Sequence, residues 1–310
     1  MAEHGAQVLE ALRKAPGFET VTAVDQITRL GGLTNLVHRV DIGGRSVIVR
    51  IPGDGTEAYI DRAVELHNAR AAAKAGISPE VLYGEADSGL MISEAVPNIE
   101  TMTPDLFQSR AGSPARAGKA LATLHRSGQV FEFRFELFAM IDEYLSVLST
   151  KDVTLPDGYH DVVAAAAPVK ALLAQADVPL APCHCDPLCE NFLDDGTVMW
   201  IVDWEYSGMN DPLWDLGDLS VEAGMTAAQD AEMLTAYFGR APSAGETGRM
   251  VIHKAMCDLL WTLWGLIQVA NDNPAEDFWA YATGRFARCQ ALMTSPSFAA
   301  HMDAVRADLT

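Results

Sequence analysis

Cysteine is scarce in this chain, and its distribution argues against a disulfide framework. Only five of the 310 residues are cysteines, and three of them are close together at positions 183, 185 and 189. A small domain held by disulfides would be much richer in cysteine, so we expect free thiols. The three neighbouring cysteines surround His184, but their spacing matches no common zinc motif and no second pair follows. A metal site at these cysteines is therefore disfavoured.

Basic residues are also few. The sequence has 22 Lys and Arg against 42 Asp and Glu, which gives a formal net charge of −20. Such a chain repels phosphate backbones, and it contains no dense basic run, so binding to nucleic acid is disfavoured. The same charge mildly favours cationic ligands through long-range steering, although it serves solubility equally well.

Long apolar runs are missing as well. Runs such as Val162 to Ala174 are alanine-rich, interrupted by Pro168 and Lys170, and too short to cross a bilayer. The first residues, Met-Ala-Glu-His-Gly, show no basic segment followed by an apolar one, so we expect no secretory signal. We therefore expect a cytoplasmic protein with no membrane partner. Its length and 49% hydrophobic content predict one bilobal unit or two domains.

Residues 1–96 predict a small lobe of five antiparallel strands and one helix. β-Branched and apolar residues alternate between glycine turns, and the strands are expected at residues 27–30, 36–42, 46–51, 81–83 and 89–93. A helical period covers Tyr59 to Ala75, and Gly76 follows where a C-terminal cap belongs. We expect this lobe to bind a nucleotide.

Residues 97–310 predict a larger, α-rich lobe. Helices are expected at Ala115–His125, Phe138–Leu148 and Asp161–Gln175. Short apolar runs near residues 198–203 predict a β-hairpin beside a loop. The fold class is therefore α+β, with two lobes.

Three polar residues carry the chemistry that we predict for the large lobe. Asp186 is followed five residues later by Asn191, and Asp203 closes an apolar strand. In this order they resemble the catalytic and metal loops of kinase-like phosphotransferases. The resemblance implies phosphoryl transfer, in which the charge on the phosphate oxygens is neutralised and Asp186 accepts or orients the substrate hydroxyl. Asn191 and Asp203 offer the hard oxygen ligands that Mg²⁺ prefers. We expect a structural role for His184, and an acidic surface loop is the alternative for the whole set.

The small lobe carries a second candidate set, for the nucleotide phosphates. The loop between the first two strands contains Gly31, Gly32, Thr34 and Asn35. A glycine turn lets backbone amides approach phosphates, although a simple hairpin turn explains it equally well. Arg50 could reach the phosphates, and Glu65 on the next helix could orient it through an ion pair. A surface salt bridge is the alternative for this pair.

Five motifs occur in a particular order along almost the whole chain: Gly31-Gly-Leu-Thr-Asn, Val49-Arg-Ile-Pro-Gly, His184-Cys-Asp, Ile201-Val-Asp-Trp-Glu-Tyr206 and Trp261-Thr-Leu-Trp-Gly-Leu-Ile-Gln268. Together they resemble the choline/ethanolamine kinase family, within the aminoglycoside-phosphotransferase-like class. The resemblance implies a protein-kinase-like fold, ATP and Mg²⁺ as cofactors, and choline as the phosphate acceptor. Ethanolamine, an aminoglycoside or another small alcohol is the alternative acceptor. Cys185 and Leu188 depart from the family's pattern.

The acceptor is expected beside Trp261 and Trp264, which share one face of a helix. Aromatic faces and a negative charge are what a quaternary ammonium group requires, although such a pair more often packs a core. The resemblance adds Tyr206, Glu222 and Tyr281 to this pocket, with Glu222 as the counter-charge.

Two further points stay open at this stage. Asp215 is expected either to brace the catalytic loop by accepting its backbone amides or to cap a helix, and the sequence favours neither. A binding module without activity is the non-enzyme alternative, and the presence of Asp186, Asn191 and Asp203 argues against it. A homodimer is a hypothesis that the sequence does not decide.

Overall fold

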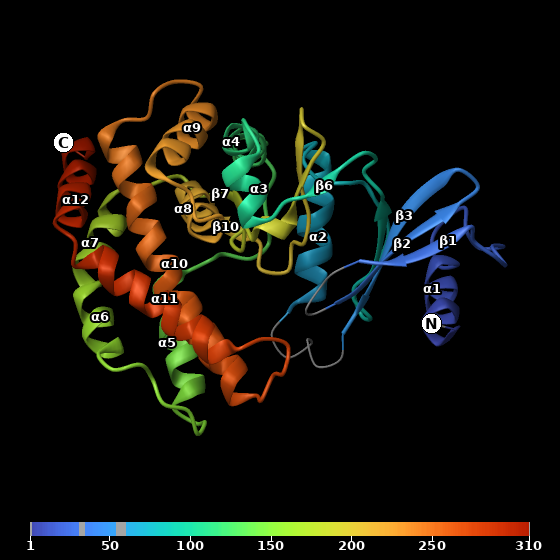
Figure 1. Ribbon diagram of the computed structural model, residues 1–310, viewed down its shortest axis with the longest axis horizontal. Helices are drawn as coiled ribbons and strands as arrows, with labels where there is room; N and C mark the ends of the chain where they lie inside the picture. The colour runs from blue at the N-terminus through green and yellow to red at the C-terminus, as the bar shows by residue number, and fades with distance from the viewer. Residues whose placement is uncertain (1, 31–34, 54–59, 310) are drawn as a thin grey trace.

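The computed structural model describes residues 2–30, 35–53 and 60–309, and these form two lobes (Figure 1). A β-sheet with two helices makes up the smaller lobe, and helices dominate the larger one. The predicted α+β, bilobal fold class is therefore confirmed.

The small lobe is built on a five-stranded antiparallel sheet with the order β1-β2-β3-β5-β4. Its strands are β1 Gln26–Arg29, β2 Asn35–Ile42, β3 Arg45–Pro52, β4 Val81–Glu85 and β5 Leu90–Glu94, so all five predicted strands are present. The expectation of a single helix in this lobe is wrong. An additional helix, α1 Ala2–Leu12, packs Val8 and Leu12 into the same core as Val40 and Val47 of the sheet. Such an amphipathic helix covers apolar side chains of the sheet that would otherwise meet water.

Helix α2 Arg62–Lys74 lies between the sheet and the large lobe (Figure 1). It begins after Asp61, whose carboxylate accepts the amides of Ala63 and Val64 and so satisfies the first turn. It ends before Gly76, which has a φ of 82°, as expected for a glycine after a helix. The helix therefore starts later than the predicted stretch from Tyr59, which itself lies outside the described residues.

The large lobe contains most of the helices: α3 Pro104–Ser109, α4 Ser113–His125, α5 Leu137–Leu148, α6 Tyr159–Ala165, α7 Ala167–Gln175, α8 Pro212–Glu222, α9 Ala227–Phe238, α10 Ala244–Ala270, α11 Phe278–Met293 and α12 Pro296–Asp308. The single helix expected at Asp161–Gln175 is wrong, because the chain forms α6 and α7 with a break at Ala166. Pro168 explains the break, since it has no amide hydrogen to continue α6 and fits only in the first turn of a new helix.

Two small sheets position the loops of the large lobe. One pairs β7 Ala181–Cys183 with β10 Gly208–Asn210, and the other has the order β6-β8-β9, with β6 Glu100–Thr101, β8 Phe192–Asp194 and β9 Met199–Ile201. The predicted hairpin is β8–β9. The segment between β7 and β8 contains Asp186 and the short 3₁₀ helix Cys189–Asn191. Both ends of this segment are therefore fixed by strand pairing.

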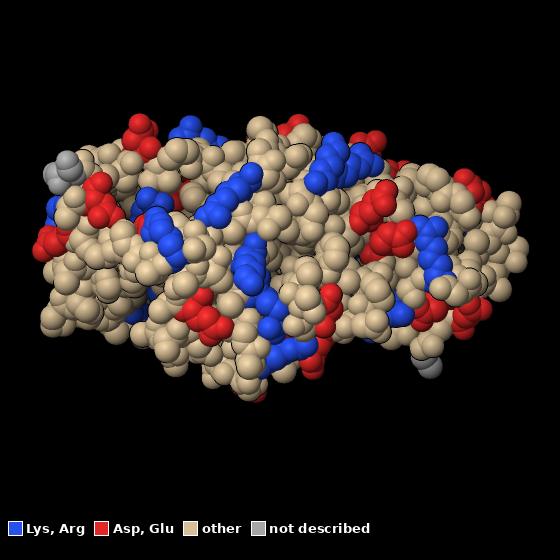
Figure 2. Space-filling view, turned by 90° about the horizontal axis from the view of Figure 1, so that it is seen from above, with Lys and Arg blue, Asp and Glu red and all other residues tan. Residues whose placement is uncertain are grey.

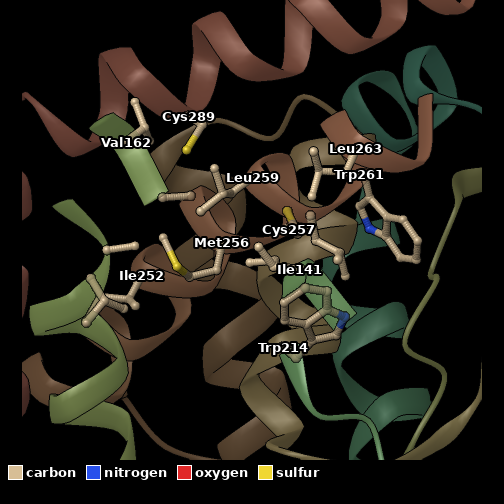
Figure 3. Close-up of a cluster of buried hydrophobic side chains, with 14 of the residues drawn as sticks. Ile141, Val162, Trp214, Ile252, Met256, Cys257, Leu259, Trp261, Leu263 and Cys289 are labelled. Carbon is tan, nitrogen blue, oxygen red and sulfur yellow. The ribbon is translucent and has the colours of Figure 1, made fainter. Parts of the chain in front are cut away.

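Helix α10 is the centre of the large-lobe core. Figure 3 shows Ile252, Met256, Leu259 and Trp261 of this helix pointing into a cluster with Trp214, which is buried with them. By length and composition α10 could cross a bilayer, but 78% of its most apolar 18-residue window is buried inside the protein. Its apolar character is explained by packing against other helices.

Charged side chains are dispersed on the face seen in Figure 2. Lys and Arg side chains form separate groups there, interrupted by uncharged and acidic residues. On this face, the chain shows no continuous basic surface of the kind that binds nucleic acid.

The contact between α4 and α9 allows a test of the packing. A Cβ atom added at Gly118 would clash with the backbone carbonyl oxygen of Met233. The same Cβ atom would lie 3.3 Å from the backbone nitrogen of Tyr237. We expect Gly118→Ala to lower the free energy of unfolding by about 1–3 kcal/mol, because neither backbone can yield without shifting a helix. Gly284→Ala is the matched control: this helical glycine is exposed and has nothing within 4 Å of such a Cβ. It should leave stability unchanged or raise it by up to about 1 kcal/mol. Urea unfolding of both variants measures this, and equal stabilities would contradict the packing argument.

Candidate active site

Asp215 of α8 holds the loop that carries Asp186. Its carboxylate accepts the backbone amides of His184, at 2.7 Å, and Cys185, at 2.9 Å, and it is hydrogen-bonded to Nε2 of His125 at 3.0 Å. Cys185 has a φ of 67°, an uncommon conformation that these bonds stabilise. Helix α8 is capped instead by Asp211, which accepts the amide of Leu213. Of the two roles left open for Asp215, the structure therefore supports bracing of the loop.

His184 connects this loop to the segment that bears Asp203. Its Nε2 atom lies 2.9 Å from the carbonyl oxygen of Val202, and its ring packs against Trp204. Burial lowers the pKa of His184, which keeps the ring neutral and suited to this backbone contact. These contacts agree with the predicted structural role.

Asp186 follows directly in the loop. Burial raises its pKa to about 7, and repulsion from the Glu222 carboxylate contributes to this shift. A carboxylate with a pKa near neutrality can both accept and release a proton at physiological pH. The side-chain amide of Asn191 donates to the backbone carbonyl of Asp186 at 3.2 Å, so the two predicted site residues are in contact.

Arg50 and Glu65 form the predicted ion pair. The surface salt bridge considered as the alternative is excluded, because the two side chains are only 11% and 1% exposed. The Arg50 guanidinium also lies 3.4 Å from Asp203 and 3.7 Å from Glu205. A basic group of the small lobe therefore reaches the acidic groups that follow β9.

Glu205 is a site residue that the sequence analysis missed. Its Oε1 atom accepts from Asn35 Nδ2 at 2.6 Å and from Arg62 at 2.8 Å, and Arg62 also contacts Glu65 at 2.8 Å. Asn35, which we expected at the nucleotide phosphates, thus bonds a carboxylate of the other lobe. The signal in the sequence was a second acid two residues after Asp203. The other loop residues predicted there, Gly31, Gly32 and Thr34, lie outside the described residues.

The carboxylates between the lobes have the chemistry of a magnesium site. Side-chain oxygens of Glu65, Asp203 and Glu205 all lie within 4.8 Å of one another. Asp203 has a φ of 69°, so its backbone is held in a rare conformation at this position. Because Asn191 uses its NH₂ group on Asp186, its carbonyl oxygen is the remaining polar atom of that side chain. Asn191, Asp203 and Glu205 together offer the oxygen donors that Mg²⁺ prefers.

The predicted acceptor residues come together from three parts of the chain. Trp264 Nε1 donates to the Tyr206 hydroxyl at 3.2 Å, and the rings of Tyr206 and Trp261 meet edge to face with centroids 5.7 Å apart. Tyr281 of α11 lies at the same centroid distance from Trp264. Trp261 is only 3% exposed, so it also packs the core. The four aromatic side chains therefore form one cluster, and Trp261 is also part of the core.

Glu222 adjoins this cluster, but it has a cationic partner that the sequence analysis did not identify. Its carboxylate pairs with Arg285, whose guanidinium carbon lies 4.5 Å from the centroid of the Tyr281 ring. The negative charge of Glu222 is therefore largely balanced by Arg285, which modifies its predicted role as the counter-charge.

Comparison with known proteins gives a consistent family of relatives. Residues 26–247 match the model of the phosphotransferase enzyme family. The crystal structure of a choline/ethanolamine kinase family protein from Mesorhizobium loti is 59% identical, with a TM-score of 0.89, and the match covers 97% of this chain and 98% of that one. Choline kinase LicA from Streptococcus pneumoniae is 26% identical, with a TM-score of 0.74 and coverage of 88% and 94%. A structure of LicA in complex with AMP matches at 27% identity and a TM-score of 0.69, with coverage of 87% and 91%. Ethanolamine kinase 2 from Mus musculus is 28% identical over an alignment 271 positions long, and the match covers 77% of this chain and 68% of that one.

Replacing Asp215 tests its role as the brace. We expect Asp215→Ala to lower the free energy of unfolding by about 3 kcal/mol or more, because it leaves two buried amides without an acceptor. Asp195→Ala is the matched control, since Asp195 also accepts two backbone amides, from Thr197 and Val198, but on an exposed turn. Asp195→Ala should lower the free energy of unfolding by less than about 1.5 kcal/mol, because water can replace the carboxylate as acceptor of the two amides. If urea unfolding gave the same loss of unfolding free energy for both variants, burial of Asp215 would not explain its contribution to stability.

Proposed function

This chain belongs to the choline/ethanolamine kinase family of phosphotransferases, and we propose that it transfers the γ-phosphoryl group of ATP to the hydroxyl group of choline. Membership of the family makes it a small-molecule phosphotransferase. The choice of acceptor is our proposal, because the relatives include both choline and ethanolamine kinases.

The observation that carries the choice of choline is the aromatic cluster. Tyr206, Trp261, Trp264 and Tyr281 contact one another through ring edges and faces. A quaternary ammonium group has no hydrogen to donate, so it is bound best by aromatic faces near negative charge. Ethanolamine carries N–H donors and is served as well by a carboxylate alone.

The same site accounts for the reaction. Asp186 orients the acceptor hydroxyl and takes its proton while the alcohol oxygen bonds to the γ-phosphorus and ADP leaves. Arg50, held by Glu65, supplies a positive charge for the phosphate oxygens. Mg²⁺, when bound by Asn191, Asp203 and Glu205, would neutralise phosphate charge. The complex of the relative LicA with AMP supports nucleotide binding by this chain. A cytoplasmic location and a homodimer stay predictions.

Removing the proposed base separates turnover from nucleotide binding. We expect Asp186→Ala to lower kcat by about a hundredfold or more, since a positioned base contributes that much, while Mg-ATP still binds. Glu190→Ala is the control, because Glu190 is an exposed carboxylate of the same loop and should keep near wild-type turnover. Release of ADP in a coupled assay and nucleotide titration measure the two properties. Turnover of Asp186→Ala within about tenfold of wild type would refute the assignment.

The choice of acceptor is tested with the wild-type protein and one aromatic variant. Wild type should phosphorylate choline in preference to ethanolamine, thiamine and an aminoglycoside. Trp264→Ala should raise the KM for choline by about two- to thirtyfold, which corresponds to the loss of one cation–π contact, and should affect ethanolamine less. Trp279→Ala is the control, because this tryptophan is 45% exposed on α11. A preference of wild type for another acceptor would overturn choline. Equal losses on both substrates, with a sharply lower Tm, would show that Trp264 serves only the core.

A further inference from the structure

Asp218 is a buried carboxylate at the base of the aromatic cluster. It lies on α8, one turn before Glu222, and is 1% exposed. Its Oδ2 atom accepts the indole N–H of Trp261 at 3.1 Å. Its Oδ1 atom is buried without a hydrogen-bond partner in the part of the chain that the structure describes.

The charges around Asp218 are unequally distributed. Arg285 pairs with Glu222 and lies 3.2 Å from Asp258, and Arg288 lies 2.7 Å from Asp258. Both of these neighbouring carboxylates therefore have a guanidinium partner. Among the described residues, Asp218 has no ion pair within 4 Å, so it is the least compensated acid of this group.

An anchoring role for Trp261 does not by itself explain an aspartate here. The side chain of Asn is the same size and would accept the indole N–H equally well, without a charge to bury. A buried acceptor atom without a partner costs about 1–3 kcal/mol, and such costs persist mainly at functional sites. The position of Oδ1 therefore indicates an interaction that is made only when a ligand is present.

We propose that Asp218 is a specificity-determining residue for the acceptor, which fixes the Trp261 ring through one oxygen and contributes the uncompensated negative charge that selects a cationic alcohol over an uncharged one. This inference rests on the proposed function and deepens it, since it assigns the charge selectivity of the same pocket. Acceptance of the indole N–H by a carboxylate also polarises the ring and strengthens its attraction for a cation.

The surroundings of Asp218 make its charge responsive to the ligand. Burial raises the pKa of Asp218, and the nearby Glu222 carboxylate raises it further, while Arg285 acts in the opposite direction. A cation bound beside the cluster favours the ionised carboxylate and is in turn attracted by it. An uncharged alcohol of the same shape produces no such effect. The selectivity therefore comes from charge, whereas the aromatic side chains contribute to the binding of both.

A comparison of choline with its uncharged carbon isostere, 3,3-dimethylbutan-1-ol, tests the inference. In Asp218→Asn, the KM for choline should rise by about tenfold or more, because one charge close to the ligand is lost. The KM for the isostere, the KM for ATP and the Tm should change little. Asp230→Asn is the matched control, because Asp230 is also a buried carboxylate but has Lys254 as its partner at 2.9 Å. This control should leave the preference for choline over the isostere unchanged.

Two results would overturn the inference. Equal changes of KM for choline and the isostere in Asp218→Asn, with active wild type, would show that Asp218 only anchors Trp261, and the proposed function would stand. If wild type neither binds nor phosphorylates a cationic amino alcohol, the proposed function fails first and the inference fails with it. If Asp218→Asn does not fold, Asp218→Ala is used instead, because it removes the charge without adding a buried side-chain amide. The ratio of the KM for choline to the KM for the isostere is then measured in that variant.

Discussion

One face of helix α8 determines how the large lobe is organised. Asp211, Asp215, Asp218 and Glu222 follow one another at helical spacing, and each carboxylate holds a different part of the structure. Asp211 caps the helix and pairs with His253 at 3.0 Å, and Asp215 braces the loop that carries Asp186. Asp218 anchors Trp261, and Glu222 pairs with Arg285. The loop that carries Asp186 and the aromatic cluster are therefore positioned by the same rigid element, which fixes their relative placement more precisely than two loops could.

The contact between the lobes depends on a second set of charges. Glu205 accepts hydrogen bonds from Asn35 and Arg62 of the small lobe, and Arg50 of β3 forms an ion pair with Asp203. Arg50 and Arg62 balance the charge of carboxylates that are suited to a metal ion, and Asn35 adds a hydrogen bond. A metal bound by Asp203 and Glu205 would compete with Arg50 and Arg62 for the same oxygens. The same carboxylates therefore link the two lobes through Arg50, Arg62 and Asn35.

The sequence predicted the parts of this protein that depend on local pattern. Alternating apolar residues located the five strands, and Pro168, visible in the sequence, explains a helix break that periodicity alone did not predict. The spacing of Asp186, Asn191 and Asp203 predicted a catalytic loop, and the structure places Asp186 and Asn191 in contact within one loop. Arg285, Arg62 and Glu205 were missed because their roles come from partners more than 60 residues away in the chain or in the other lobe. No local pattern encodes such pairs. The packing of α8 and α11 against α10 accompanies the pairing of Glu222 with Arg285, and the contact between the lobes brings Arg62 to Glu205.

The tryptophans illustrate why core and functional interpretations of a residue need not exclude one another. Trp261 is buried among the core side chains of α10 (Figure 3). Its ring still meets Tyr206 of the aromatic cluster edge to face. Core packing holds such a ring in one orientation, so little conformational entropy remains to be lost when a ligand binds. The hydrogen bond from Trp261 to Asp218 adds a second constraint and ties the ring to a buried charge. A binding surface for a cation that cannot donate hydrogen bonds gains most from this rigidity, because its affinity depends on the placement of aromatic faces.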